Sequence, residues 1–483
     1  MTVVLDQPLS WTSASEDTAA MLQQLQANIL KAHVADHLML WCCRFADGGT
    51  LRAFLRAARP LVKSAATHLA EAREFAATGR PGTPYVGIAL TATGYELLDL
   101  AATHRPFDPS FLAGARARIG DLGDPALDEW QQAQVEPFDV LVLIGDTDVR
   151  AVARSAKMLR PMLGRTTRVH VERGRTMRNG AGRPIEHFGY VDGISQPLAL
   201  TEDVAAARSD PHGWDPTVPL GQMITIDHGV PGSTSAFGSY LVFRKLEQHV
   251  RDFATATRDL ADRLVAAGTD AMAPGAADDR AGALLIGRYR DGTPLVSSPA
   301  PAGTPGQRPA NGFGYRQDVE GNRCPLHAHI RKLNARGTGS AVELGGLDSA
   351  TLERMERSHM MARRGITYGV RTDDPDDPSV PPEARPIRGV GLLFMAVGST
   401  IRDQFEFQQR RWANNPNFPT ASVPPGLDPL IGSSAAHDIQ CPARWGGSAS
   451  VGVALPRFVG LLGAEYGFLP SLAFLAEPGP PEE

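Results

Sequence analysis

The sequence predicts an α+β protein built from a duplicated unit of strands and helices. Short apolar runs that suit buried strands alternate with stretches of helical spacing between positions 37 and 159. The same alternation begins again after a passage rich in proline, glycine and aspartate at 210–238. With 483 residues, the chain is also long enough for two domains of roughly 200 residues each.

Each half contains several expected elements. In the first half, a helix is expected at 21–30, and strands are expected at 37–45, 84–91 and 138–144. The helix after the second strand has a cap near Thr93. The helix after the third strand has Asp146 as its N-cap and runs to about Leu159. In the second half, strands are expected at 239–244 and 389–397. One helix is expected from about 247 onward, and another follows the second strand and ends at about 412.

Composition excludes several classes of function. A net charge of −5 and a pI of about 6.2 provide no basic field for nucleic acid. No apolar run approaches the length of a membrane span, and the first residues lack a signal-peptide pattern. The four cysteines, of which Cys42 and Cys43 are adjacent, do not form a disulfide framework. We therefore expect a soluble cytoplasmic protein without nucleic-acid or membrane partners.

The stretch 324–336 offers a metal ligand in His329. Cys324 and His327 have only half of the spacing of a zinc site, because no second Cys or His pair follows them. A single imidazole can still hold iron when a porphyrin supplies four nitrogens. His327 would face the same side in an extended chain and stays an alternative ligand, and a hydrogen-bonded histidine without metal is the simpler interpretation.

Glycines flank Asp192 in the stretch 188–197. Gly189 and Gly193 permit positive φ and a close approach of the backbone to a flat ligand, over which the carboxylate would be held. The competing interpretation is an ordinary Asp-Gly turn in which the aspartate caps its own backbone.

Two further positions have comparable alternatives. Arg363 and Arg364 precede a glycine, so that one guanidinium could enter a pocket, or both could be solvated at a strand end. Asp403 could cap or ion-pair a helix. It could instead accept the second ring N–H of a ligating histidine.

Together, these segments resemble the dye-decolorising peroxidases. The likeness rests on 189–193 for the distal aspartate motif, 328–336 for the proximal histidine segment and 363–369 for the distal arginine segment. Supporting likenesses run from 26–33 to 404–414, so that the resemblance covers most of the chain and suggests one of the longer members.

The resemblance implies the architecture. The fold would be a pair of ferredoxin-like domains of the dimeric α+β barrel superfamily. We expect an N-terminal arm at 1–20, a first domain at 21–215 that carries Asp192, a haem-binding domain at 216–475 and a disordered tail at 476–483.

The resemblance also implies a reaction and roles for single residues. One haem b per chain would reduce hydrogen peroxide and oxidise dyes, phenols or other bulky aromatic reductants in one-electron steps. The roles would be iron ligand for His329, acceptor from its Nδ1–H for Asp403, catalysis for Asp192 and Arg363, and cofactor contact for Arg331, Gly193 and Ile194. Trp412, Tyr289 and Tyr315 could relay electrons to the surface by residue type.

Other functions compete with this one. The first is a haem carrier or iron-release protein with little turnover, which would not need both Asp192 and Arg363. A cofactor-free cargo protein is the second, and a hydrolase is weaker because no Gly-x-Ser-x-Gly elbow is present. A homo-oligomer is compatible with the sequence.

Overall fold

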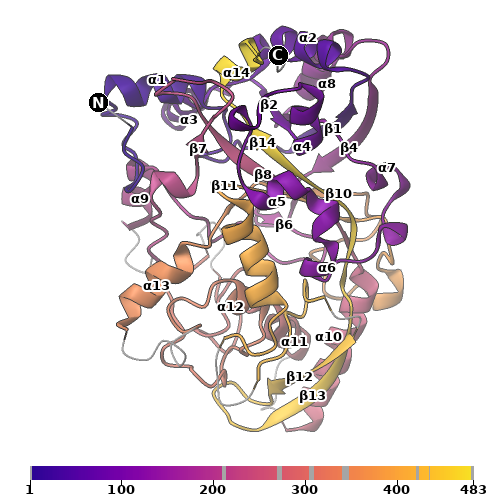
Figure 1. Ribbon diagram of the computed structural model, residues 1–483. Helices are drawn as coiled ribbons and strands as arrows, with labels where there is room; N and C mark the ends of the chain where they lie inside the picture. Colours follow the sequence, from indigo (N-terminus) through magenta and orange to yellow (C-terminus); the bar gives the residue numbers. More distant parts are fainter. Residues whose placement is uncertain are drawn as a thin grey trace.

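The computed structural model describes residues 3–208, 214–268, 275–303, 309–339, 347–419, 424–433 and 436–479. Its main feature is a β-α-β-β-α-β unit that occurs once in each half of the chain (Figure 1). The first unit contains β1 (His37–Arg44), α2 (Gly48–Ala58), α3 (Ala65–Thr78), β2 (Tyr85–Leu90), β3 (Val140–Asp146), α8 (Val149–Leu159) and β4 (Arg168–Arg175). The second contains β8 (Phe237–Gln248), α10 (Val250–Ala266), α11 (Ala276–Ile286), α12 (His329–Leu333), α13 (Ser349–Arg357), β10 (Ile366–Tyr368), β11 (Gly391–Gly398), the π-helical segments η8 (Ile401–Glu406) and η9 (Gln408–Ala413), and β14 (Val459–Leu469).

Strand order confirms the duplicated ferredoxin-like fold. The two halves pair antiparallel in the orders β2-β3-β1-β4 and β10-β11-β8-β14, which are the same order when the strands of each unit are counted from one to four. The pair Phe468–Leu90 joins the halves. At the other ends, the Thr367 hydroxyl on β10 donates to the Arg175 carbonyl on β4, so that the two end strands of the sheet lie against each other.

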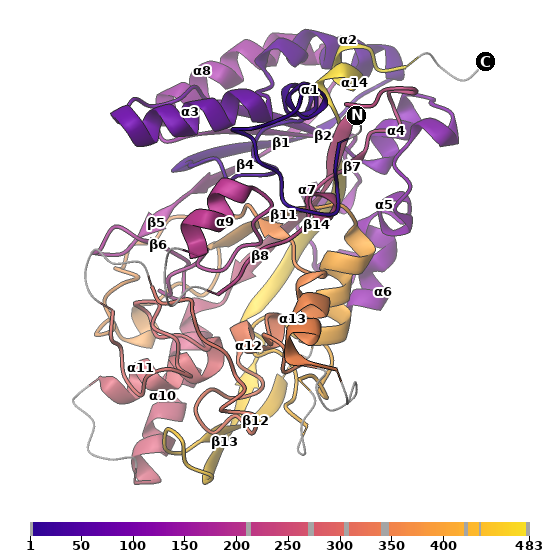
Figure 2. The same ribbon diagram turned by 90° about the vertical axis from the view of Figure 1, so that its left-hand side faces the viewer.

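The helices form two groups. Helices α1 (Glu16–Gln24), α2, α3 and α8 make one layer over the strands of the first unit (Figure 2). At the opposite end of the molecule, α10 and α11 lie with the hairpin of β12 (Ala436–Pro442) and β13 (Ser450–Pro456). Besides short 3-10 turns, the remaining α-helices and strands of the described residues are α4 (Ala92–Leu97), α5 (Pro109–Ala113), α6 (Ile119–Leu122), α7 (Gln132–Val135), β5 (Met177–Arg178), β6 (Pro184–Ile185), α9 (Thr201–Arg208), β7 (Thr225–Ile226), β9 (Ala362–Arg363) and α14 (Leu472–Ala476).

A cluster of buried hydrophobic side chains spans the two units. Trp41 and Phe54 of the first unit share a buried cluster with Tyr466 and Phe468 of the second. Large aromatic side chains dominate the free energy of burial, so that the two units stabilise each other. The domain boundaries at 20, 215 and 475 stay a prediction.

Several helix starts differ from the expectation by a few residues. Helix α1 begins at Glu16, inside the expected arm, because the Ser15 hydroxyl accepts the backbone N–H of Thr18. The cap expected near Thr93 is Thr91, which begins α4, whereas Asp148 rather than Asp146 caps α8. At the other terminus, the Pro478 and Gly479 carbonyls accept from Arg52, which shows packed chain where disorder was expected, and 480–483 lie outside the described residues.

Within the ranges given above, no helix has the length and apolar character that crossing a membrane requires.

Candidate active site

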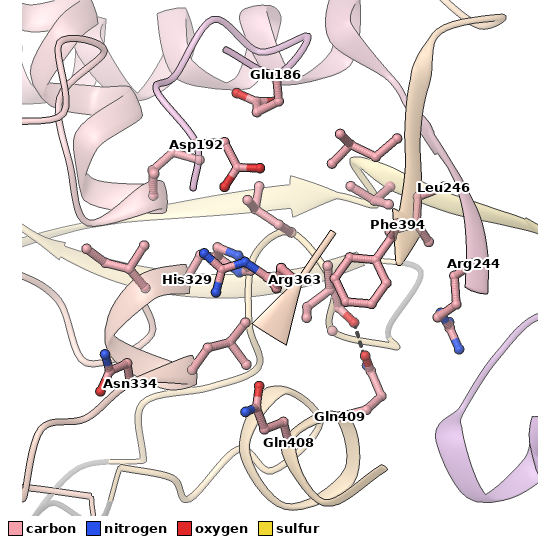
Figure 3. Close-up of a pocket in the computed structure, with 18 of the residues that line it drawn as sticks. Glu186, Asp192, Arg244, Leu246, His329, Asn334, Arg363, Phe394, Gln408 and Gln409 are labelled. Atoms are coloured by element: carbon pink, nitrogen blue, oxygen red, sulfur yellow. Dashed lines mark hydrogen bonds between the residues drawn. The ribbon is translucent and has the colours of Figure 1, made fainter. Parts of the chain in front are cut away.

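A cavity of about 290 Å³ brings together three of the predicted site residues, Asp192, His329 and Arg363. Figure 3 shows Asp192 and Glu186 on one side of it, His329 and Arg363 in the middle, and Gln408 and Gln409 on the opposite side. Much of the remaining wall is apolar and comes from β8, α12, β11, η8 and the segment after Asp428, with the side chains of Leu246, Leu333, Leu392, Phe394, Phe405 and Ile431.

His329 is the first residue of α12, and its imidazole lines the cavity. Its Nδ1 lies 2.8 Å from Oδ2 of Asp428, a carboxylate with no exposed surface. Burial lowers the pKa of His329, but the charge and hydrogen bond of Asp428 outweigh it and raise the pKa above its ordinary value. Because Nδ1 is engaged, Nε2 is the ring nitrogen left for a ligand in the cavity.

Hydrogen bonds to both carboxylate oxygens fix the position of Asp428. Its Oδ1 accepts the backbone N–H groups of Leu430 (2.8 Å) and Ile431 (3.0 Å), while Oδ2 faces His329. Burial raises the pKa of Asp428, but the His329 charge and these hydrogen bonds reverse the shift and keep the pKa below its usual value. A carboxylate in this position fixes the ring and increases the basicity of the other nitrogen.

Asp403, the expected partner of His329, does not lie there, and this expectation is wrong. Its side chain at the start of η8 is 71% exposed, and its carbonyl accepts from the His359 ring. The Thr400 hydroxyl, rather than Asp403, caps the segment by accepting the Asp403 backbone N–H. The Asp403 carboxylate lies 4.0 Å from the Arg402 guanidinium, the ion pair on a helix that was the alternative interpretation.

His327 is directed away from the cavity. The premise of an extended chain is wrong here, because a helix begins at His329 and His327 precedes it. The His327 ring is buried, with Nε2 at 3.8 Å from Sγ of Cys441, and it does not line the cavity.

Asp192 stands on a tight hairpin. The backbone N–H of Asp192 donates to the Pro184 carbonyl, and Val191 pairs with Ile185. Gly189 adopts φ +94°, and a Cβ there would lie 2.2 Å from a guanidinium nitrogen of Arg290, so that only glycine suits the turn.

The Asp192 carboxylate is exposed and combines both predicted interpretations. Its Oδ1 accepts the N–H of Gly193 at 2.6 Å, as in an Asp-Gly turn, and the side chain also lines the cavity. Gly193 and Ile194 line the cavity, and their contact with the cofactor stays a prediction.

Glu186 belongs to the same hairpin and was missed in the sequence. Its carboxylate lines the cavity and accepts the backbone N–H groups of Phe188 (2.8 Å) and Tyr190 (3.0 Å). It also accepts from the Gln248 amide, and burial raises its pKa. Glu186 therefore ties the aspartate turn to β8.

The two adjacent arginines diverge. Arg363 lines the cavity, where a guanidinium nitrogen donates to the Ser195 carbonyl at 3.1 Å. Arg364 is turned to the N-terminal segment, with bonds to the carbonyls of Asn28 (2.6 Å) and Ile29 (2.7 Å). Because both Arg363 and Asp192 contribute to the electrostatics of the His329 ring, the three charged groups share one cavity.

Comparison with known proteins shows the family to which the chain belongs. The chain is 46% identical to the multifunctional dye peroxidase DyP2 of an Amycolatopsis species over 98% of this chain and 99% of the relative. The chain belongs to the dye-decolorising peroxidase family. The solved structure of that DyP2 superposes with a TM-score of 0.90 and covers 98% of this chain and 100% of the other. The structure of a DyP-type peroxidase of an Anabaena species, which is 31% identical, superposes with a TM-score of 0.87 and covers 99% of this chain and 98% of the other.

A more distant structure adds a ligand. A dye-decolorising peroxidase in complex with 2,6-dimethoxyphenol matches at 26% identity and a TM-score of 0.75, over 94% of this chain and 98% of that chain. A scan of protein-family models found no match. Membership in the dye-decolorising peroxidases makes the chain a peroxidase of a haem-dependent family, and nothing in the comparisons supports a haem carrier.

The residues of the cavity fit a haem. Besides the imidazole and the apolar walls, two buried arginines, Arg288 and Arg336, line it. The Arg336 guanidinium donates to the carbonyls of Asn311 and Phe313 and to the Asn311 side-chain oxygen, all uncharged acceptors. Burial lowers the pKa of Arg336 to about 9, and that of Arg288 to about 10. A ligand carboxylate, such as a haem propionate, would compensate these charges.

The expected cofactor contact of Arg331 is contradicted by the structure. Arg331 is buried on the other face of α12, where it bonds the Asp318 carboxylate at 2.9 Å and the Cys324 carbonyl. The structure therefore replaces Arg331 by Arg336 at the cavity wall. The suggested relay residues Trp412, Tyr289 and Tyr315 are all buried, so that none of them lies at the surface.

Proposed function

We propose that this protein is a haem b peroxidase that reduces hydrogen peroxide and oxidises dyes and phenols. The observation that carries the proposal is that an Asp428-bound imidazole, Asp192 and Arg363 line one cavity. Haem, when bound, supplies the redox-active iron at which peroxide is reduced and through which single electrons are taken from a reductant. The names of the relatives support dyes as substrates, and the 2,6-dimethoxyphenol complex supports phenols.

His329 would hold the iron through Nε2, and Asp428 would hold the ring. The Nδ1–H donated to Asp428 gives the imidazole partial imidazolate character, which stabilises the oxidised states of the metal. Arg336 and Arg288 would bind the haem propionates. Gly193 and Ile194, which also line the cavity, would contact the haem.

Asp192 would move the proton that the reaction requires. Peroxide must lose a proton from its inner oxygen and gain one on its outer oxygen before the O–O bond breaks. A positioned carboxylate that accepts and returns this proton contributes a factor of about 10²–10⁴ in rate. The Arg363 guanidinium, fixed by the Ser195 carbonyl, would orient the peroxide and stabilise the negative charge that develops on the leaving oxygen.

Absorption spectra test the assignment. We expect haem-loaded wild type to show a Soret band of a histidine-bound haem that changes with one equivalent of peroxide. His329→Ala should lose this band or its histidine signature, while the matched His327→Ala should keep both. A normal histidine-bound spectrum in His329→Ala would contradict the proposal.

Turnover tests the substrate class. With peroxide, the wild type should oxidise 2,6-dimethoxyphenol and an anthraquinone dye, and the Asp192→Asn variant should be slower with both.

The four free cysteines, all buried, support a reducing compartment such as the cytoplasm.

A further inference from the structure

Lys332, one turn after His329 on α12, has a fully buried ammonium group. Its Nζ donates to the carbonyls of Asn415 (2.9 Å), Phe418 and Gly426 (2.7 Å). An ammonium has three N–H donors, and these three carbonyls use all of them. Burying a charge is costly unless such partners compensate it, so the site is built for this side chain.

The three carbonyls belong to two chain segments, one before and one after residues 420–423, and the second segment continues to Asp428. Asn415 and Phe418 lie before the residues 420–423, which are outside the described part of the chain, and Gly426 lies after them. The Gly426 N–H donates to the Pro416 carbonyl, and the Asp428 N–H donates to the Ala413 carbonyl, both at 2.9 Å. Lys332 therefore bonds to both sides of a loop that ends at the carboxylate facing His329.

The same short helix thus holds both partners of one hydrogen bond. His329 supplies the ring, and Lys332 anchors the loop that supplies Asp428. Burial lowers the pKa of Lys332 to about 8, and the Asp428 charge acts in the opposite direction. Lys332 is therefore mainly charged at neutral pH, as a donor to three carbonyls requires.

We propose that Lys332 is a positioning residue of the peroxidase, whose contacts with the Asn415, Phe418 and Gly426 carbonyls hold Asp428 against His329. The inference rests on the proposed function, because it assumes that His329 binds the haem iron. It adds a residue that touches neither haem nor peroxide and acts only through Asp428.

The sign of a change in the Fe(III)/Fe(II) midpoint potential separates this role from others. A weaker Asp428–His329 hydrogen bond removes imidazolate character, which destabilises ferric iron and raises the potential. Loss of a nearby positive charge through space would instead favour the ferric state and lower the potential. A role in folding alone would leave the potential unchanged.

The test compares Lys332→Met with Lys332→Gln in the haem-loaded protein. We expect the midpoint potential to rise in Lys332→Met, and to rise less in Lys332→Gln, which keeps two N–H donors. In the Asp428→Asn background, Lys332→Met should cause no further rise, because both changes remove the same interaction. Lys332→Gln keeps the test open if Lys332→Met does not fold.

Lys63 provides a matched control. It is another buried lysine, which bonds Glu71 and the Thr83 carbonyl in the first unit. Lys63→Met should lower the free energy of unfolding, but its Fe(III)/Fe(II) midpoint potential should equal that of wild type. In haem-free protein, hydrogen exchange of the Asp428 amide should be faster in Lys332→Met than in Lys63→Met.

Three results would overturn the inference: a potential that falls or stays unchanged in Lys332→Met, an additive rise in the double variant, or unchanged exchange at Asp428. The wild-type spectrum separates this failure from a failure of the proposed function. If wild type is not ligated by His329, the proposed function fails with it. If wild type is ligated normally and the potential of Lys332→Met does not rise, only the role of Lys332 fails.

Discussion

Replacing Asp428 by Asn tests the proximal side of the site with little change of shape. Asn keeps an oxygen that can accept from Leu430 and Ile431, but it removes the charge that faces Nδ1 of His329 at 2.8 Å. A hydrogen bond to a charged group is worth about 1.5–3 kcal/mol. If about half of this stabilises ferric over ferrous iron, the difference is about 1 kcal/mol, or roughly 40 mV for one electron.

We therefore expect Asp428→Asn to raise the midpoint potential by roughly 40 mV or more, and to weaken metal binding or activity about 10- to 100-fold. Spectroelectrochemical titration measures the potential, and the rate of haem transfer to apomyoglobin measures retention. Asp403→Asn is the matched control and should match wild type in both assays, because this carboxylate is exposed. An unchanged potential in Asp428→Asn, or an equal shift in Asp403→Asn, would refute the reasoning.

Three other outcomes follow from the same geometry. Arg363→Leu should slow the reaction with peroxide by a factor of about 10²–10³ in stopped-flow measurements, whereas Arg364→Leu should lower thermal stability and leave that rate within a few-fold of wild type. Arg336→Met should release haem about 10- to 100-fold faster, because it loses a charge that faces a propionate. Burial lowers the pKa of His187 to about 4 in the fold, below the ordinary value of about 6.5, so the unfolded chain takes up a proton first as the pH falls. His187 thus contributes stability above pH 6.5 that is lost toward pH 4, and His187→Gln should reduce the fall in unfolding free energy between pH 6.5 and 5 by roughly 1.5 kcal/mol in denaturant titrations.

The sequence predicted most of the strands because their apolar patterns are local. The apolar run at 389–397 became β11 within two residues, and the expected strand at 37–45 became β1. Gly189 and Gly193 indicated the turn around Asp192, and both adopt the positive φ that was expected of them. Resemblance then related Asp192, His329 and Arg363, which no local pattern could join.

The errors arose where tertiary contacts decide. Asp428 lies 99 residues after His329 in a loop, and its sequence signal is no more than that of an aspartate that caps a turn. Arg331 and Arg336 are both cations after the histidine. Arg331 lies within α12 and bonds Asp318, whereas Arg336 follows the end of the helix, adopts φ +52° and lines the cavity.

The reaction of the haem-loaded protein with hydrogen peroxide tests the central claim most directly, namely that Asp192 would move the peroxide proton in the cavity where His329 would hold the haem iron. Stopped-flow absorbance would follow the Soret band after mixing wild type or Asp192→Asn with excess peroxide. We predict that the second-order rate constant falls by about 10²–10⁴ in Asp192→Asn, while the resting spectrum keeps its histidine ligand. An unchanged rate constant in Asp192→Asn would contradict the account.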